Sequence, residues 1–143
     1  MITRAQIIAD LMACLASIDP DHGFPLAVRE LRRGIHLAEE LAEMPALTLF
    51  NERVETLDQT SSTAARRLVL HLWGAVHVRH DDYSQLDQLA AACLKALADP
   101  NFNPHWQATS CGRLEVYEGG AGDPLGLFDL EFTVDYESPL DTL

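Results

Sequence analysis

The stretch LFDLEFTVDYE, residues 127–137, decides the fold of this chain. Every second residue from Phe128 to Tyr136 is apolar or aromatic, whereas Asp129, Glu131 and Asp135 occupy positions between them. Because successive side chains of a strand point to opposite faces of a sheet, this alternation predicts a half-buried strand with an acidic outer side.

A second strand is predicted over residues 67–78. One set of alternate positions carries the apolar side chains of Leu68, Leu70, Leu72, Val76 and Val78. The opposite set is also largely apolar and comprises Val69, His71, Trp73, Ala75 and His77. Apolar residues on both faces indicate a central strand that is covered on both sides.

Two helices are predicted from apolar residues at helical spacing. The first spans residues 3–17 and begins with a capping box formed by Thr3 and Gln6. The second begins with a similar pair, Asp82 and Gln85, and ends before the Asp-Pro pair at 99–100. Its buried stripe is predicted to contain Leu86, Leu89, Ala90, Cys93, Leu94 and Leu97.

The remaining segments complete a predicted sheet. Strand signals at 46–50 and 53–55 are followed by a polar loop at 58–63, and a strand at 107–118 is followed by a glycine-rich turn at 119–124. Residues 101–104 are predicted to be a loop, and residues 26–44 fit either a short strand followed by a short helix or an irregular connection. The order predicts one α+β domain over 1–143, with a mostly antiparallel sheet of four to five strands and two main helices packed on it.

Composition narrows the function. Apolar residues form 48% of the 143-residue chain, enough for a core without disulfides or a metal. The formal net charge of −12 opposes binding to phosphate backbones, so we expect no sequence-specific nucleic-acid binding. The termini predict neither a signal peptide nor a membrane span. The odd set Cys14, Cys93 and Cys111 predicts free thiols in a reducing compartment.

No catalytic or metal-binding pattern is present in the sequence. His71 and His77 share a predicted strand face about 20 Å apart, too far to hold one ion between them. A G-x-S-x-G elbow and a phosphate-binding loop are both lacking, and Cys93 lies on the apolar stripe of its helix. We therefore expect no enzyme activity, no metal and no cofactor.

Several stretches, in their order, resemble the tail terminator family of long-tailed phages, of the lambda minor tail protein U type. PALTLF at 45–50 resembles the family's Phe-Pro-Ala-x-x-x-Tyr strand entry, although Met44 replaces the aromatic residue. ERVE at 52–55, LVLHLW at 68–73 and SQLDQL at 84–89 follow in the family's order. The final FDLEFTVDYE at 128–137 resembles its aromatic and acidic last strand. The resemblance covers residues 44–137, and the region 19–43 departs from the family by having a longer insertion.

The resemblance implies a structural virion protein. It would form a homo-hexameric ring at the head-proximal end of the tail, after assembly in the host cytoplasm. The ring would stop polymerisation of the tail tube protein and offer a surface to a head completion or connector protein. DNA would pass through the ring, and no membrane would be involved.

The polar hairpin is the predicted protein interface, because the core cannot use its side chains. The residues placed there are Glu55, Asp58, Thr60, Ser61, Arg66 and Arg67. A merely solvated loop would have the same composition. The alternative function is a small acidic inhibitor or DNA mimic, in which the carboxylates of Asp129, Glu131, Asp135 and Glu137 imitate phosphates.

Overall fold

A computed structural model describes residues 2–99, 108–119 and 124–143. The elements follow the order α1 (Arg4–Ala16), β1 (Glu30–Arg33), β2 (Ala46–Gln59), β3 (Thr63–His77), α2 (Ser84–Ala98), β4 (Ala108–Glu118) and β5 (Leu125–Pro139). The strands form one five-stranded sheet in the order β1-β2-β3-β5-β4. Among the described strands, β1 and β2 pair in parallel and the other pairs are antiparallel. The predicted α+β class is confirmed.

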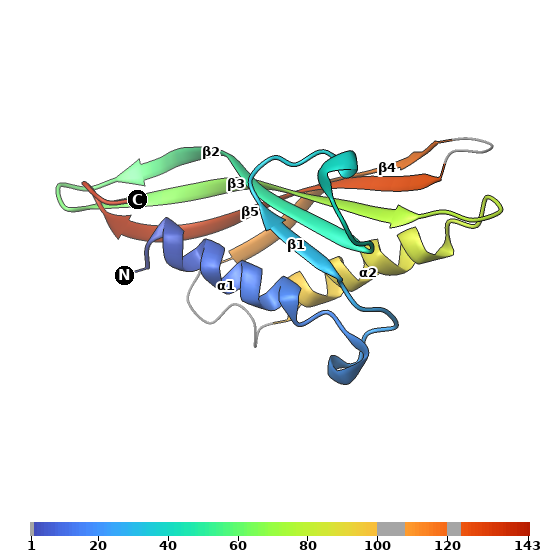
Figure 1. The fold of residues 1–143 in the computed structure, drawn as a ribbon. Helices are drawn as coiled ribbons and strands as arrows, with labels where there is room; N and C mark the ends of the chain where they lie inside the picture. The colour runs from blue at the N-terminus through green and yellow to red at the C-terminus, as the bar shows by residue number, and fades with distance from the viewer. Residues whose placement is uncertain (1, 100–107, 120–123) are drawn as a thin grey trace.

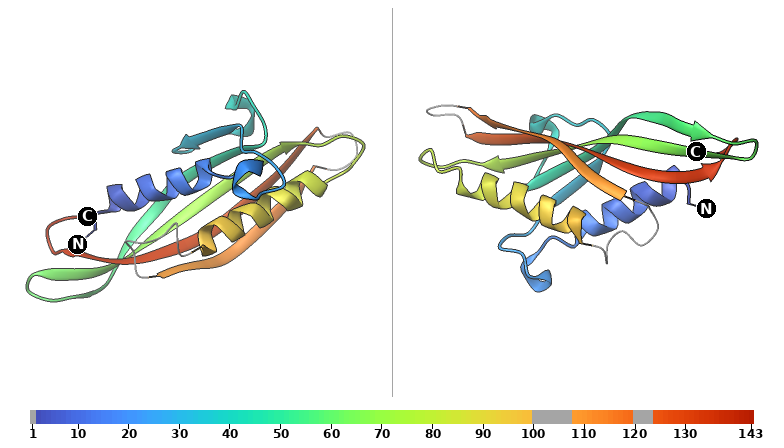
Figure 2. Two further views of the ribbon diagram at one scale, coloured as in Figure 1. Left: turned by 90° about the horizontal axis from the view of Figure 1, so that it is seen from below. Right: turned by 180° about the vertical axis from the view of Figure 1, so that it is seen from behind.

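Both helices lie on one face of the sheet, as Figures 1 and 2 show. The core fills the space between them and the sheet. Its sheet side is made by alternate residues of β3 and β5, and the predicted row from Phe128 to Tyr136 is at most 1% exposed. We call the opposite face of the sheet the outer face, and neither α1 nor α2 packs on it.

The start of α1 is the predicted one. Thr3 Oγ1 accepts a hydrogen bond from the Gln6 amide, and Gln6 Oε1 accepts one from the Thr3 amide, so the capping box is present. The predicted capping box of α2 is wrong. The helix begins at Ser84, one residue later than a cap at Asp82 would place it. Its cap is Tyr83, which makes no side-chain hydrogen bond. Asp82 instead accepts a hydrogen bond from the Ser84 amide at 3.0 Å.

The β2–β3 hairpin is longer than predicted. Strand pairing continues up to the pair of Gln59 with Ala64, so the turn is residues 60–62. The expected loop at 58–63 is therefore wrong at both ends. Likewise β3 runs from Thr63 to His77, not over 67–78. The hairpin projects beyond the helices (Figure 1), and its tip is exposed, so no apolar period marks these strand residues.

The prediction that β3 is central is correct, and the prediction that both of its faces are covered is correct only in part, because the outer face is partly covered. On the outer face Val69 and Ala75 are buried, His71 and Trp73 are half-buried, and His77 is exposed. Partial cover comes from residues 34–43, which we call the arm. The arm joins β1 to β2 and contains a 3₁₀ helix at Ala38–Glu40. Residues 26–44 therefore contain a short strand followed by a short helix.

Two predicted loops fall wholly or partly beyond the residues that the structure describes. The loop at 101–104 lies outside the described residues, as do residues 120–123 of the turn predicted at 119–124. The strand predicted to begin at residue 107 is described from Ala108.

Candidate protein-binding face

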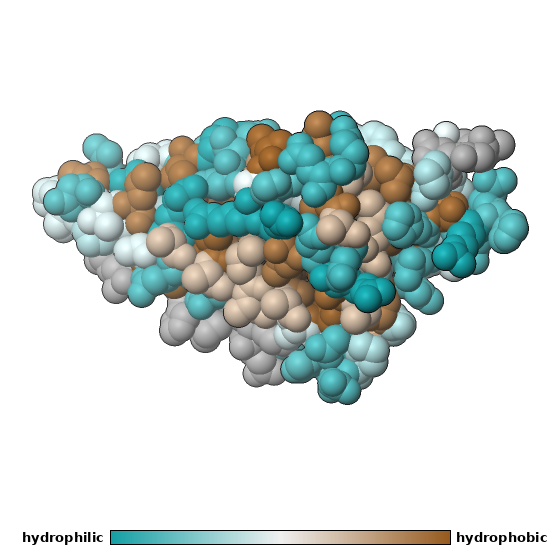
Figure 3. All heavy atoms as spheres, viewed as in Figure 1, coloured by the Kyte–Doolittle hydropathy of each residue, from teal (hydrophilic) through white to brown (hydrophobic). Residues whose placement is uncertain are grey.

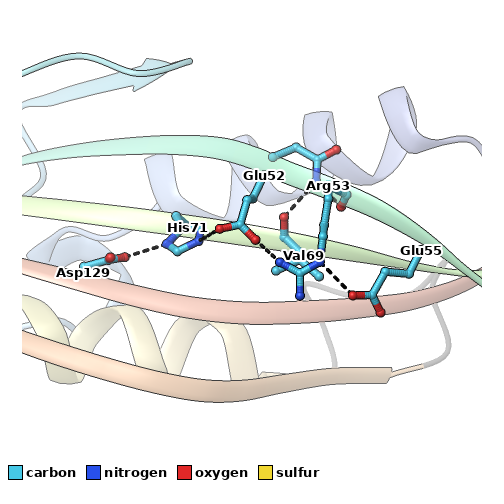
Figure 4. Close-up of polar contacts among 7 residues, drawn as sticks. Glu52, Arg53, Glu55, Val69, His71 and Asp129 are labelled. Atoms are coloured by element: carbon cyan, nitrogen blue, oxygen red, sulfur yellow. Dashed lines mark hydrogen bonds and ion pairs between the residues drawn. The ribbon is translucent and has the colours of Figure 1, made fainter.

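The outer face of the sheet presents a histidine held between two carboxylates. His71 on β3 places Nδ1 2.9 Å from Asp129 Oδ1 on β5 and Nε2 3.1 Å from Glu52 Oε1 on β2 (Figure 4). The imidazole also stacks on Phe50, with ring centroids 5.0 Å apart and planes 6° from parallel. Phe50 in turn makes an edge contact with Trp73. One side chain thus ties three strands together.

This geometry favours the charged form of His71. Partial burial alone opposes a positive ring, but the hydrogen bonds and charges of Asp129 and Glu52 outweigh it and raise the pKa of His71 above its ordinary value. A neutral imidazole has one N–H, so it can donate to only one of the two carboxylates. The imidazolium donates to both.

Arginines extend the network along the outer face. Arg53 on β2 donates Nε to Glu55 Oε1 at 2.8 Å and also pairs with Glu52 (Figure 4). Arg67 on β3 binds Asp135 on β5 with two bonds, at 2.7 and 3.0 Å. Such fork-shaped pairs fix the orientation of both groups. The outer face is therefore patterned with paired charges of both signs.

An apolar pocket of about 240 Å³ adjoins this network. Its walls come from the arm on one side and from β2, β3, β4 and β5 on the other, and include Leu37, Leu41, Trp73, Tyr117 and Leu127. Leu37 and Tyr117 stand at its rim and are 50% and 49% exposed. Asp129 lines the pocket as well as binding His71, so pocket and network are contiguous.

Glu30 holds the arm in place. Its Oε1 accepts hydrogen bonds from the amides of Ala42 and Glu43, at 2.8 and 3.0 Å, while Oε2 accepts from Arg32. These backbone bonds, together with Arg32, lower the pKa of the Glu30 carboxyl. Figure 3 shows hydrophobic atoms reaching the surface along the upper edge, where the arm lies, and Ile35 of the arm is 65% exposed.

The structure separates the predicted interface residues into two groups. Glu55 and Arg67 are register partners on the outer face, and both belong to its charged network. Arg66 faces the other way and donates to Ser138 Oγ, Thr56 Oγ1 and the Leu140 carbonyl. Its guanidinium therefore ties the hairpin to the C-terminal end of the chain.

The other three predicted interface residues lie near the tip of the hairpin. Thr60 Oγ1 accepts from the amides of Ser62 and Thr63 and so closes the turn. Asp58 accepts only from the neighbouring Gln59 amide among the described residues, and both Asp58 and Ser61 are exposed. Asp58 and Ser61 thus remain available to a partner.

Sequence reasoning missed the outer-face site around His71. The sequence shows only the spacing of His71 from His77 on its own strand, whereas the partners of His71 come from β2 and β5. The register of the strands decides which side chains meet, and no local pattern encodes it here. The pocket is not predictable in the same way, because the sequence of the arm that walls it fits two conformations.

Reactive and metal-binding groups are scarce in the described part of the chain. No group of three or more metal-ligating side chains is found there. Cys14 and Cys93 are buried free thiols, and burial followed by the charge of Asp99 raises the pKa of Cys14 to about 11. Burial also raises the pKa of Cys93. No described helix is long and apolar enough to cross a membrane.

Comparisons with known proteins leave the family open. No model of a known protein family matches the chain, and no curated protein has a significantly similar sequence.

Proposed function

We propose that this chain is a structural virion protein of the tail terminator type, which caps the phage tail tube as a homo-hexameric ring. Its cap ends addition of tail tube protein and presents a new surface for head-tail joining. The ordered sequence resemblance over residues 44–137 supports this proposal, as does the agreement of the fold class with the one expected.

The observation that carries the proposal is that the two helices cover one face of the sheet and leave the other face only partly covered. Both helices pack on one face, while the outer face keeps an apolar pocket rimmed by Leu37 and Tyr117 beside fixed ion pairs. Protein interfaces typically combine an apolar centre with a polar rim. A face of this kind suits contact with other protein subunits better than it suits catalysis.

A ring cap has a simple physical logic. Subunits of a tube meet through head-to-tail contacts that never close, so growth continues until the end surface changes. A closed ring that fits the tube on one side but does not repeat its surface on the other stops that growth. The excess of 22 acidic over 10 basic residues would let DNA pass the ring without adhering.

The test combines solution mass with a capping assay. We expect hexameric rings in electron micrographs, and shorter tubes when the protein is added to polymerising tail tube protein from the same genome. Tubes of unchanged length would contradict the proposal.

Two variants locate the contact. Tyr117→Glu on the outer face should weaken ring formation or capping, because it places a charge at the rim of the pocket. Val116→Glu is its matched control, since Val116 is similarly exposed, at 44% against 49%, but points to the other side of β4. Equal effects of the two substitutions would show that the outer face has no special role.

The alternative proposal, an acidic inhibitor or DNA mimic, rests on the carboxylates of β5. Asp129, Glu131 and Asp135 share the outer face as predicted, but Asp129 is bound to His71 and Asp135 to Arg67. Carboxylates already paired within the chain imitate phosphates poorly. Tight binding to a basic nucleic-acid enzyme, competed by DNA, would favour this alternative.

A further inference from the structure

A second hollow lies away from the pocket of the outer face. It is a cleft of about 480 Å³ between the start of α1 and the end of β1. The residues that line it are Arg4, Arg33, Gly34, Ile35, Phe50 and Asn51. Two arginines and an exposed isoleucine therefore border one cleft, which is unusual in so acidic a chain.

The arginines of this cleft differ from most others in the chain. Arg29, Arg32, Arg53, Arg67 and Arg113 each pair with a carboxylate. Arg4 and Arg33 pair with none among the described residues. Arg4 donates Nε to Asn51 Oδ1 at 2.7 Å, which orients its guanidinium, and Arg33 is exposed. Two unpaired cations beside one cleft favour an anionic occupant.

The tip of the β2–β3 hairpin has the complementary chemistry. Asp58 is exposed and negatively charged, and its neighbour Leu57 is a large apolar residue that is 46% exposed. Leu57 lies where the strand register shifts, between Thr56 and Asp58. The negative charge of Asp58 complements the arginines of the cleft, and the apolar side chain of Leu57 complements that of Ile35.

The hairpin cannot fill the cleft of its own chain. Phe50 of the cleft and Asp58 of the tip lie on the same strand, β2, and eight residues of extended chain span about 26 Å. The hairpin also projects away from the body of the molecule (Figure 1). An occupant with this tip must therefore come from a second copy.

We infer that the cleft bordered by Arg4 and Arg33 binds the Leu57–Asp58 segment, near the hairpin tip, of a second copy of this chain. The contact joins two different surfaces, so its repetition builds a ring if the rotation closes. This inference deepens the proposed function and rests on it only for the number of copies in the ring.

Charge reversal tests the contact. Arg33→Glu should weaken self-association at least about tenfold in sedimentation velocity, because it turns attraction to Asp58 into repulsion. Arg79→Glu is the matched control, since Arg79 is exposed, has no carboxylate partner among the described residues and lies outside the cleft. It makes the same charge change and should leave the association within about threefold of the original.

A charge swap keeps the test valid if Arg33→Glu alone disturbs folding. The double variant Arg33→Glu with Asp58→Arg restores opposite charges across the contact and should recover most of the lost association. Circular dichroism checks that each variant is folded. Failure of the swap to restore association, with both variants folded, would overturn the inference.

The outcomes separate this contact from the proposed function. If rings form and cap tubes but Arg33→Glu leaves them intact, the contact is wrong and the function stands. If association depends on Arg33 and is restored by the swap, yet tubes are never capped, the contact stands and the function is wrong. A protein that remains monomeric at every concentration overturns the contact, and the capping assay then decides the function separately.

Discussion

The two faces of the sheet are held by different physical means. On the helix face, β3 and β5 contribute a continuous row of apolar side chains that are sealed under α1 and α2. On the outer face, the same strands contribute His71 and Arg67 and the carboxylates of Asp129 and Asp135 that bind them. One face is fixed by burial, which depends on area, and the other by directional polar contacts, which depend on register.

This difference separates stability from binding. Burial of a whole row of large side chains contributes most of the folding free energy, whereas partly exposed ion pairs contribute little each. The outer face can therefore accept changes that would unfold the protein if made on the helix face. Substitutions that move from one face to the other test this separation.

The largest effect is expected from Phe132→Ala. Phe132 is 0% exposed at the centre of the helix face, and its truncation should reduce the free energy of unfolding by about 3–5 kcal/mol. The neighbouring Glu131→Gln, on the outer face, should change it by no more than about 0.5 kcal/mol. Urea unfolding of both variants measures the contrast. Similar losses would show that the two faces do not differ as described.

Gly74→Ala should come next. Gly74 on β3 lies opposite Phe128 on β5, and an added Cβ would lie 2.0 Å from a ring carbon of Phe128. The displaced ring should cost about 1–3 kcal/mol of stability. Combining Gly74→Ala with Phe128→Leu should cost less than the sum of the two single changes, because the clash is then relieved. Strict additivity in thermal unfolding would contradict this account.

The helix face was the predictable one because its signal is local. Alternation from Phe128 to Tyr136 identified β5, and the spacing of Leu86, Leu89 and Cys93 identified the buried stripe of α2. Side chains of the core are mostly apolar, so their positions are visible in the sequence. The α1 capping box of Thr3 with Gln6 is also predictable, because its two residues are close together in the sequence.

Features that depend on distant partners were not predictable in the same way. Residues 56–59 at the end of β2 are exposed, so they carry no apolar period, and the polar sequence at 58–63 predicts a loop where strand pairing continues. The contacts of His71 with Asp129 and Glu52 form only when three strands pair in one register. The arm has little regular structure of its own and is held by Glu30.

A smaller effect, dependent on pH, is expected at His71. Because its folded pKa is raised, the charged ring stabilises the folded state at pH values below the unfolded pKa, and this stabilisation is lost as the pH rises through the folded pKa. The melting temperature of the original protein should therefore exceed that of His71→Asn most at pH 6 or below. The gap should narrow as the pH rises above the ordinary histidine value of about 6.5. A difference in melting temperature that does not change with pH would show that a charged His71 does not stabilise the folded state.

The smallest effect on global stability, and the most local, is expected at Glu30. Its carboxylate binds the amides of Ala42 and Glu43, so Glu30→Ala should accelerate hydrogen exchange at those two amides and leave the rest of the sheet protected. The Arg29 amide is the internal control, because it donates to the Pro45 carbonyl at 2.8 Å without help from Glu30.

Acid should reproduce this local release in the unsubstituted protein. The folded pKa of Glu30 is lowered, so its contribution is present above the unfolded pKa and is lost as the pH falls through the folded value. Protection of the Ala42 and Glu43 amides, corrected for the intrinsic pH dependence of exchange, should decline over that range. If the arm stays protected in Glu30→Ala, contacts in the pocket hold it instead, and the outer face is then fixed by burial in the same way as the helix face.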